Sequence, residues 1–201
     1  MMKINYQAEQ DKIIKGLTIK PKLLLHACCG PCSSACIERL SEHFLITVFW
    51  YDPCIHPEAE YVKRLENLKK LIVSLDTPEP VDLLEAEYEP QSYFERIKGL
   101  ENEPEGGERC TVCFTQRLER TAKEASARGF DYFTTTLTVS PHKDAERINR
   151  IGYEAAEHFG SSFLPSDFKK KNGYLRSIEL SRMFDLYRQD YCGCVYSMRS
   201  E

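Results

Sequence analysis

The chain has 201 residues, of which 42% are hydrophobic and 29% are charged, as in ordinary soluble globular proteins. Its formal net charge of −4 excludes a protein that is basic over its whole surface, so any contact with nucleic acid would need a local basic patch. No stretch approaches the ~20 apolar residues of a membrane span, and the first eleven residues lack the apolar core of a signal peptide. We therefore expect a cytoplasmic protein that makes no membrane contact.

Strands and helices alternate along most of the chain. We expect a loosely docked lead-in over residues 1–20 that includes a helical turn, followed by a single α/β domain over 21–201. The expected strands cover residues 23–25, 44–51, 81–86 and 130–140, with a short fifth strand within 161–168. The expected helices run from Ser33, after a turn at Gly30-Pro31, to Leu40, over 58–75 and 89–98, from just after Cys113 to a stop at Gly129, from the N-cap Asp144 to Phe159, and over 176–187. This alternation predicts a parallel sheet with helices on both faces.

Nine cysteines are a high count for such a chain. Structural disulfides are rare in the reducing cytosol, and an odd number of cysteines does not suit a disulfide framework. The cysteine content therefore predicts metal ligands or redox groups.

Two cysteine pairs are candidates for one metal centre. Cys28 and Cys29 follow the first strand, and Cys110-x-x-Cys113 stands before a later helix. Four such thiolates suit an iron–sulfur cluster or a structural zinc ion, and the spacing leaves both open. Cys32 is a candidate ligand for a second metal or a free thiol beside the first, whereas Cys36 and Cys54 are expected to be structural.

Cys192-Gly-Cys194 near the end of the chain is a different pattern. Two thiols separated by one glycine can close into a strained, easily reduced disulfide, which suits a dithiol that delivers two electrons. Two further metal ligands, or a buried pair without redox work, are the alternatives.

Substrate contacts are less clearly marked. His142 and Lys143 follow the fourth expected strand and are candidates, whereas His26 and His56 are expected to be satisfied hydrogen-bonding residues. The last quarter of the chain also mixes basic residues and tyrosines, the types that contact phosphates and stack on bases: Lys169, Lys170, Lys171, Arg176, Arg182 and Arg188, with Tyr174, Tyr187 and Tyr191. This is weak support for an RNA partner.

Several motifs together resemble the QueH family of cobalamin-independent epoxyqueuosine reductases. They are His26-Ala-Cys-Cys-Gly-Pro-Cys32, Ile55-His-Pro57, Arg109-Cys-Thr-Val-Cys113-Phe, the run from Gly129 to Leu137 with Ser140-Pro-His-Lys-Asp144, Asp167-Phe-Lys-Lys170, and the segments from Gly173-Tyr to Tyr191-Cys-Gly-Cys194. The chain departs from the family at Asp52-Pro-Cys54, where asparagines are expected around the proline.

The resemblance implies a Rossmann-like sheet of the PP-loop (HUP-like) type. It implies reduction of epoxyqueuosine to queuosine at the wobble position of tRNA, with an unidentified electron donor. It further implies a 4Fe–4S cluster on Cys28, Cys29, Cys110 and Cys113, a second mononuclear iron with Cys32 as a candidate ligand, and a redox-active pair formed by Cys192 and Cys194; Arg176 is carried as a possible substrate contact.

Two other functions compete with this one. A tRNA sulfur-inserting enzyme would need an ATP-binding Ser-Gly-Gly-type loop after the first strand, where this chain has Cys28-Cys-Gly-Pro31. A zinc-stabilised RNA-binding module would be colourless and hold zinc instead of iron.

Overall fold

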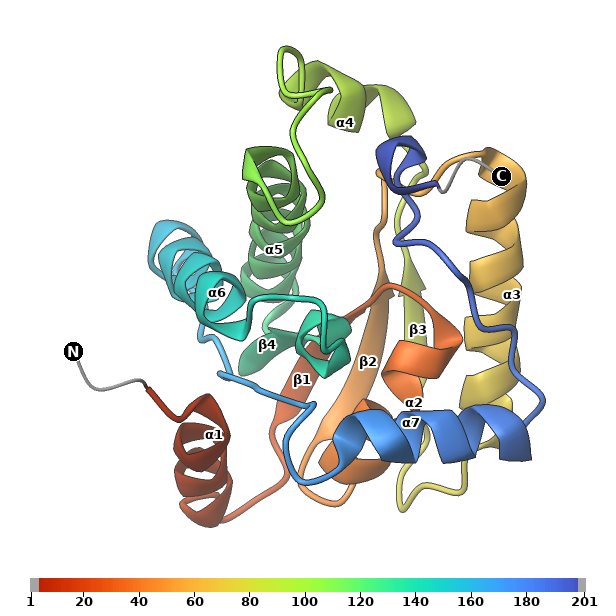
Figure 1. Ribbon diagram of the computed structural model, residues 1–201. Coiled ribbons are helices and arrows are strands. Elements are labelled where there is room, and N and C mark those ends of the chain that lie inside the picture. Colours follow the sequence, from red (N-terminus) through yellow and green to blue (C-terminus); the bar gives the residue numbers. More distant parts are fainter. Residues whose placement is uncertain (1–3, 199–201) are drawn as a thin grey trace.

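A computed structural model describes residues 4–198 of the chain. Within these residues, four parallel strands form one sheet in the order β3-β2-β1-β4 (Figure 1). The strands are β1 (Lys22–Ala27), β2 (Leu45–Trp50), β3 (Asp82–Glu85) and β4 (Tyr132–Thr135). The predicted parallel α/β sheet is confirmed.

Helices cover both faces of this sheet (Figure 1). Helices α2 (Gly30–Leu40), α3 (Glu58–Ser74) and α7 (Gly173–Met183) pack together on one face. Helices α5 (Glu108–Arg128) and α6 (Ala145–Phe159) pack together on the other face. The remaining helical elements are α1 (Tyr6–Lys15), α4 (Pro90–Arg96) and two short 3₁₀ turns, η1 (Thr136–Val139) and η2 (Val195–Ser197).

Two hydrophobic cores lie on opposite faces of the sheet, as the two-residue period of a strand requires. In β1, Leu23 and Leu25 belong to the core beneath α2 and α3, whereas Leu24 belongs to the core beneath α5 and α6. In β2, Val48 and Phe49 divide in the same way. Burial on both faces explains why these strands read as continuous apolar runs.

The lead-in is more ordered than expected. Residues 6–15 form a ten-residue helix, α1, in which Tyr6, Gln7 and Gln10 are buried. The Gln10 side chain donates to the Pro165 carbonyl at 2.9 Å. The expectation of a loosely docked segment is therefore wrong for this part, because Gln10 bonds to Pro165 and the apolar Ile13 and Ile14 pack against the core beneath α2 and α3.

Two helices begin earlier than expected. Gly30 and Pro31, expected as a turn, form the first residues of α2, where proline fits because its missing N–H leaves no intrahelical bond unmade. Gly30 is also needed for close packing, since a Cβ there would lie 2.8 Å from the Asn67 carbonyl oxygen of α3. Helix α5 begins at Glu108, so Cys110 and Cys113 lie inside the helix instead of before it.

The later elements are shorter or shifted. Strand β4 has four residues and continues as η1, and the expected fifth strand is reduced to a single parallel bridge between Phe133 and Phe163. Helix α7 begins at Gly173 and ends at Met183. Asp144 caps α6 as expected, its side chain accepting from the Glu146 and Arg147 N–H groups. Among residues 4–198, no helix combines the length and the hydropathy needed to cross a bilayer.

Candidate active site

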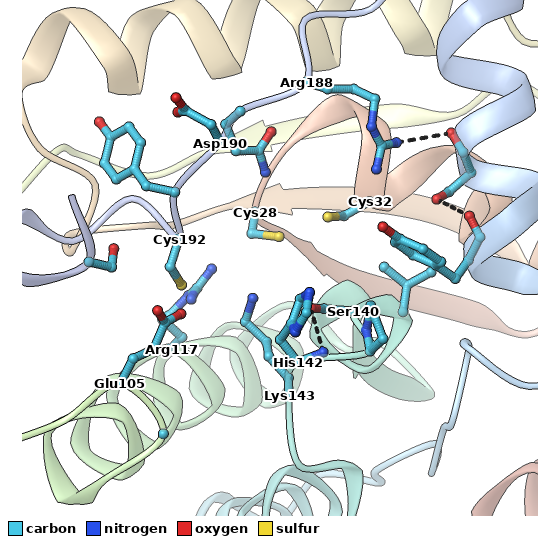
Figure 2. Close-up of a pocket in the computed structure, with 18 residues that line it drawn as sticks. Cys28, Cys32, Glu105, Arg117, Ser140, His142, Lys143, Arg188, Asp190 and Cys192 are labelled. Carbon is cyan, nitrogen blue, oxygen red and sulfur yellow. Dashed lines mark hydrogen bonds between the residues drawn. The ribbon is translucent and has the colours of Figure 1, made fainter. Parts of the chain in front are cut away.

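The carboxyl ends of the parallel strands converge on one cavity of about 520 Å³. Strand β1 leads into Cys28 and Cys29, and β2 leads towards Asp52 and Cys54. This edge is where open α/β sheets bind ligands. Residues that line the cavity include Cys28, Cys32, Arg117, His142, Lys143, Gln189 and Cys192 (Figure 2).

A first group of cysteines lies at the start of α2. The sulfur atoms of Cys28, Cys29 and Cys32 all lie within 4.8 Å of one another, a spacing suited to a metal ion. Cys29 is the N-cap residue of α2, and its sulfur accepts from the Cys32 N–H at 3.3 Å. The exposed N–H groups and the dipole of a helix N-terminus favour thiolates at this position.

Hydrogen bonding and burial shift the pKa values of these three thiols in different directions. Hydrogen bonds from the thiols of Cys29 and Cys32 hold the pKa of Cys28 well below its ordinary value. Burial raises the pKa of Cys29 to about 12, and hydrogen bonding to the other two sulfurs raises that of Cys32. Within this group, the surroundings therefore favour a thiolate at Cys28 over one at Cys29 or Cys32.

A second group of cysteines lies at the start of α5. Cys110 accepts from the Gly106 N–H at 3.2 Å, and Cys113 is buried one turn further on. The thiol of Cys54 donates to the Cys113 sulfur, and together with the charge of Arg117 this lowers the pKa of Cys113 to about 6. Cys54, expected to be structural, therefore contacts a predicted metal ligand.

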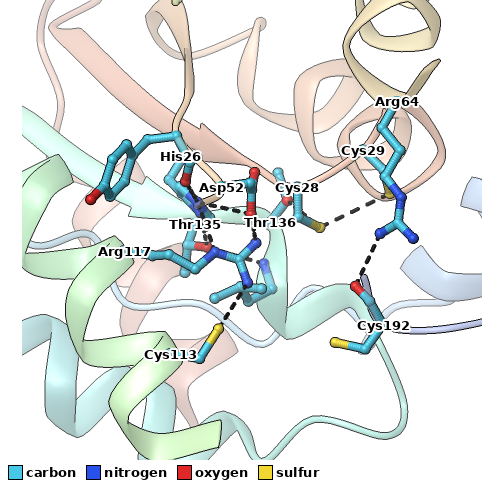
Figure 3. Close-up of polar contacts among 12 residues, drawn as sticks. His26, Cys28, Cys29, Asp52, Arg64, Cys113, Arg117, Thr135, Thr136 and Cys192 are labelled. Atoms are coloured by element: carbon cyan, nitrogen blue, oxygen red, sulfur yellow. Dashed lines mark hydrogen bonds and ion pairs between the residues drawn. The ribbon is translucent and has the colours of Figure 1, made fainter. Parts of the chain in front are cut away.

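Arg117 connects this second group to the ends of two strands (Figure 3). Its guanidinium is 3% exposed, forms an ion pair with Asp52, and donates to His26 Nε2 at 3.3 Å and to the Cys113 sulfur at 3.7 Å. His26 Nδ1 lies 2.9 Å from the Thr135 hydroxyl. Burial and the charge of Arg117 lower the pKa of His26 to about 3, so the ring is neutral, as expected of a satisfied hydrogen-bonding histidine.

The two thiols of the C-terminal motif have different surroundings. Cys192 lines the cavity, whereas Cys194 is 8% exposed and packs in the core beneath α2 and α3. Burial raises the pKa of Cys192, and thiolates at Cys113 and Cys28 add to the effect, which places Cys192 near both cysteine groups. Gln189 of the same segment donates from Nε2 to the Cys29 sulfur at 3.1 Å.

Of the three candidate substrate contacts, two line the cavity. His142 and Lys143 both do so, and Lys143 faces the thiols. Burial disfavours the charge of Lys143, but the nearby Cys192 and Cys28 outweigh burial and raise its pKa. Arg176 is not among the lining residues; its guanidinium pairs with Glu38, at 2.7 Å, and with Glu179, at 2.9 Å.

Sequence reasoning missed Arg117, Asp52 and Gln189. For Arg117 a signal existed, because Cys113, Arg117 and Thr121 recur at four-residue spacing and therefore share one face of α5. A charged residue on a buried face needs a partner. Nothing local in the sequence marks Gln189 as a partner of Cys29, since 160 positions separate them.

Comparison with known proteins identifies the family of this chain. The family model for "Epoxyqueuosine reductase QueH" matches residues 23–200. A protein of that name from Streptococcus pyogenes is 43% identical over 204 residues, covering 99% of this chain and 80% of the relative. Others from Staphylococcus epidermidis (43% over 202 residues; 97% and 85%) and Thermotoga maritima (35% over 179 residues; 88% and 90%) are also similar. With matches over nearly its whole length and a thiol-lined cavity at the sheet edge, this chain belongs to the epoxyqueuosine reductase QueH family of oxidoreductases, as its motifs predicted.

Proposed function

We propose that this protein reduces epoxyqueuosine to queuosine at the wobble position of tRNA. The family membership supports the reaction. The observation that carries the proposal is the convergence of Cys28, Cys32, Cys192 and Lys143 on one cavity at the carboxyl ends of the strands. Sulfur donors, a dithiol and a cation are the groups that a reductive removal of oxygen requires.

The donor set fits a 4Fe–4S cluster. Cys28, Cys29, Cys110 and Cys113 would hold it, since clusters of this kind take four cysteine thiolates. The pKa is lowered at Cys28 and Cys113 and raised by burial at Cys29 and Cys110, so each pair has one cysteine whose thiolate the surroundings favour. When bound, the cluster would supply single electrons to the site. Cys32, whose sulfur lies with those of Cys28 and Cys29, would be the candidate ligand for a second iron.

Oxidation of the dithiol would supply the electrons and protons that the reduction of the epoxide consumes. Loss of the epoxide oxygen as water, with formation of a carbon–carbon double bond, consumes two electrons and two protons. Oxidation of Cys192 and Cys194 to a disulfide releases two electrons and two protons. An external electron donor must then reduce the disulfide before the next turnover.

Lys143 is the side chain best placed to assist the leaving oxygen. It lines the cavity and carries a positive charge that the neighbouring thiols stabilise. A cation positioned there stabilises negative charge that develops on oxygen and can donate a proton to it. His142 lines the same wall, but its side chain is exposed.

The first experiment measures iron, zinc and acid-labile sulfide in anaerobically purified protein, followed by an assay on tRNA that carries epoxyqueuosine. We expect about four or more irons per chain and conversion to queuosine. Stoichiometric zinc in colourless protein would instead support the zinc-stabilised RNA-binding module. Full iron loading without conversion, in the presence of a chemical reductant, would overturn the proposed reaction.

A further inference from the structure

The segment that carries the dithiol lies against helix α3. After α7 the chain turns back and runs beside α3 as it approaches its own C-terminal end (Figure 1). Tyr187 begins this contact, with its N–H donating to Asn67 Oδ1 at 2.7 Å and its hydroxyl lying 3.1 Å from Glu60 Oε2. The residues of α3 therefore decide where the segment runs.

Arg64 of α3 holds the segment at the dithiol itself. Its Nη1 donates to the Cys192 carbonyl at 3.0 Å (Figure 3), and its Nη2 donates to the Tyr191 carbonyl at 3.2 Å. Its Nε donates to Glu60 at 2.7 Å, which balances the charge. Since the side chain is only 1% exposed, water cannot replace these partners, and the buried guanidinium needs them.

Two hydrogen bonds with His56 hold the backbone around Gly193, the residue after Cys192. The Gly193 carbonyl accepts from the His56 N–H at 2.8 Å, and the Tyr191 hydroxyl donates to the His56 carbonyl at 2.8 Å. Gly193 has a φ of +122°, and a Cβ there would lie 2.9 Å from Arg64 Nη1 and 3.0 Å from Ile55. The glycine between the two cysteines is therefore required both for its backbone conformation and for the approach of Arg64.

The two thiols on this backbone lie in different surroundings. Both are free in this conformation, with Cys192 at the cavity and Cys194 in the core. A disulfide would bring the two sulfurs from these different surroundings to ~2.05 Å from each other, whereas the hydrogen bonds of Arg64 are made in the dithiol conformation. Interactions that stabilise the reduced form of a dithiol make its disulfide more oxidising.

We propose that Arg64 is the positioning residue that holds the Cys192–Cys194 dithiol in its reduced conformation at the cavity wall. This inference rests on the proposed redox role of the pair. It predicts that removing the hydrogen bonds of Arg64 to this segment shifts the equilibrium between dithiol and disulfide towards the disulfide.

The test measures that equilibrium in anaerobically purified, full-length protein. The protein is equilibrated with glutathione and glutathione disulfide, which takes up two electrons and two protons and becomes two glutathione thiols as Cys192 and Cys194 form their disulfide. The state is trapped by acid and isotope-coded alkylation and read by mass spectrometry on the tryptic peptide 189–199. For Arg64→Met we expect the equilibrium constant for oxidation to rise about tenfold or more, because hydrogen bonds to a charged group are among the stronger ones.

Two further variants make the result decisive. Arg64→Lys keeps a cation beside Glu60 but cannot hold two carbonyls in a fork, so it should fold and show a smaller shift in the same direction. Lys70→Met is the matched control: Lys70 also lies on α3 and donates to a carbonyl of the same segment, that of Asp185 at 2.6 Å, but it is 46% exposed and its partner precedes Cys192 by seven residues. Its equilibrium should match that of the wild type.

An unchanged equilibrium in folded Arg64→Lys and Arg64→Met would overturn the inference, and if Arg64→Met does not fold, Arg64→Lys alone decides. A shift of equal size in Lys70→Met would also overturn it, because the effect would then belong to the whole segment. Failure of the proposed function looks different. If Cys192→Ser retains multiple turnover, the dithiol is not the electron store, even where the Arg64 variants shift the equilibrium.

Discussion

The guanidinium of Arg117 donates to the sulfur of Cys113 one turn earlier in the same helix, at 3.7 Å. The same group pairs with Asp52 at the end of β2. A single buried cation thus connects a proposed metal ligand on α5 to the edge of the sheet. Since Asp52 helps to hold Arg117 in place, the charge state of the Cys113 ligand depends on the Arg117–Asp52 pair at that edge.

Arg117→Met should destabilise the protein by about 3–5 kcal/mol, because removing one partner of a buried ion pair leaves Asp52 uncompensated. Urea unfolding of the wild type and the variant measures this difference. Arg120→Met is the control, since Arg120 lies on the same helix but is 30% exposed. Adding Asp52→Asn to Arg117→Met should cost less than the sum of the single changes, and full additivity would contradict the pairing.

Cys192→Ser should abolish multiple turnover and leave iron and sulfide content unchanged, since Cys192 is not among the proposed cluster ligands. Rapid-quench assays with excess tRNA substrate, together with iron analysis of the same sample, measure both quantities. Cys36→Ser is the matched control, because Cys36 is fully buried within α2 and does not line the cavity. Loss of iron in Cys192→Ser would mean that this thiol is a ligand.

Gln189→Glu should lower the reduction potential of the proposed 4Fe–4S cluster. The wild-type amide donates an N–H to the Cys29 sulfur at 3.1 Å, and hydrogen bonds to ligand sulfurs stabilise the more negative, reduced cluster. Glutamate has nearly the same shape but, when ionised, cannot donate. A redox titration followed by electron paramagnetic resonance measures the potential, and an unchanged value would show that the bond does not reach the cluster.

Glu124→Gln should lower stability at pH 7 by less than about 1 kcal/mol, and the effect should shrink as the pH falls below 4.5. Glu124 is 18% exposed and accepts from Arg120 and Arg128; burial raises its pKa, but these bonds outweigh burial and leave it below 4.5. Stabilisation from such a carboxylate is fully present above its unfolded pKa and is lost as the pH falls through the folded value. Thermal unfolding across this pH range checks the sign: a difference that grows on acidification would contradict it.

Local patterns predicted the central part of the fold. Strands β1 and β2 are runs of buried apolar residues, and α6 has Asp144 as a cap, so each element carries its own signal. Helix α5 carries no such signal at its start, because Gly107 caps it without a side-chain bond. That absence explains why Cys110 and Cys113 were expected before the helix.

The candidate site was predicted only in its sulfur atoms. Cysteine is rare and reactive, so its spacing identifies possible ligands without a structure. The groups that set the charge and position of the thiols come from distant elements: Arg64 on α3 contacts Cys192, which lies 128 residues further along the chain. No local period encodes such a pair, because the contact exists only once the sheet has brought the two segments together.

The unequal burial of Cys192 and Cys194 determines which sulfur of their disulfide a reductant would attack. A reductant that reaches the pair through the cavity meets Cys192, while Cys194 stays packed in the core. Attack would therefore place the mixed disulfide on Cys192 and release Cys194 as the leaving thiol. If the electron donor is itself a thiol, it would have to enter the cavity that is proposed to bind the modified nucleoside, so re-reduction and substrate binding would exclude each other in time.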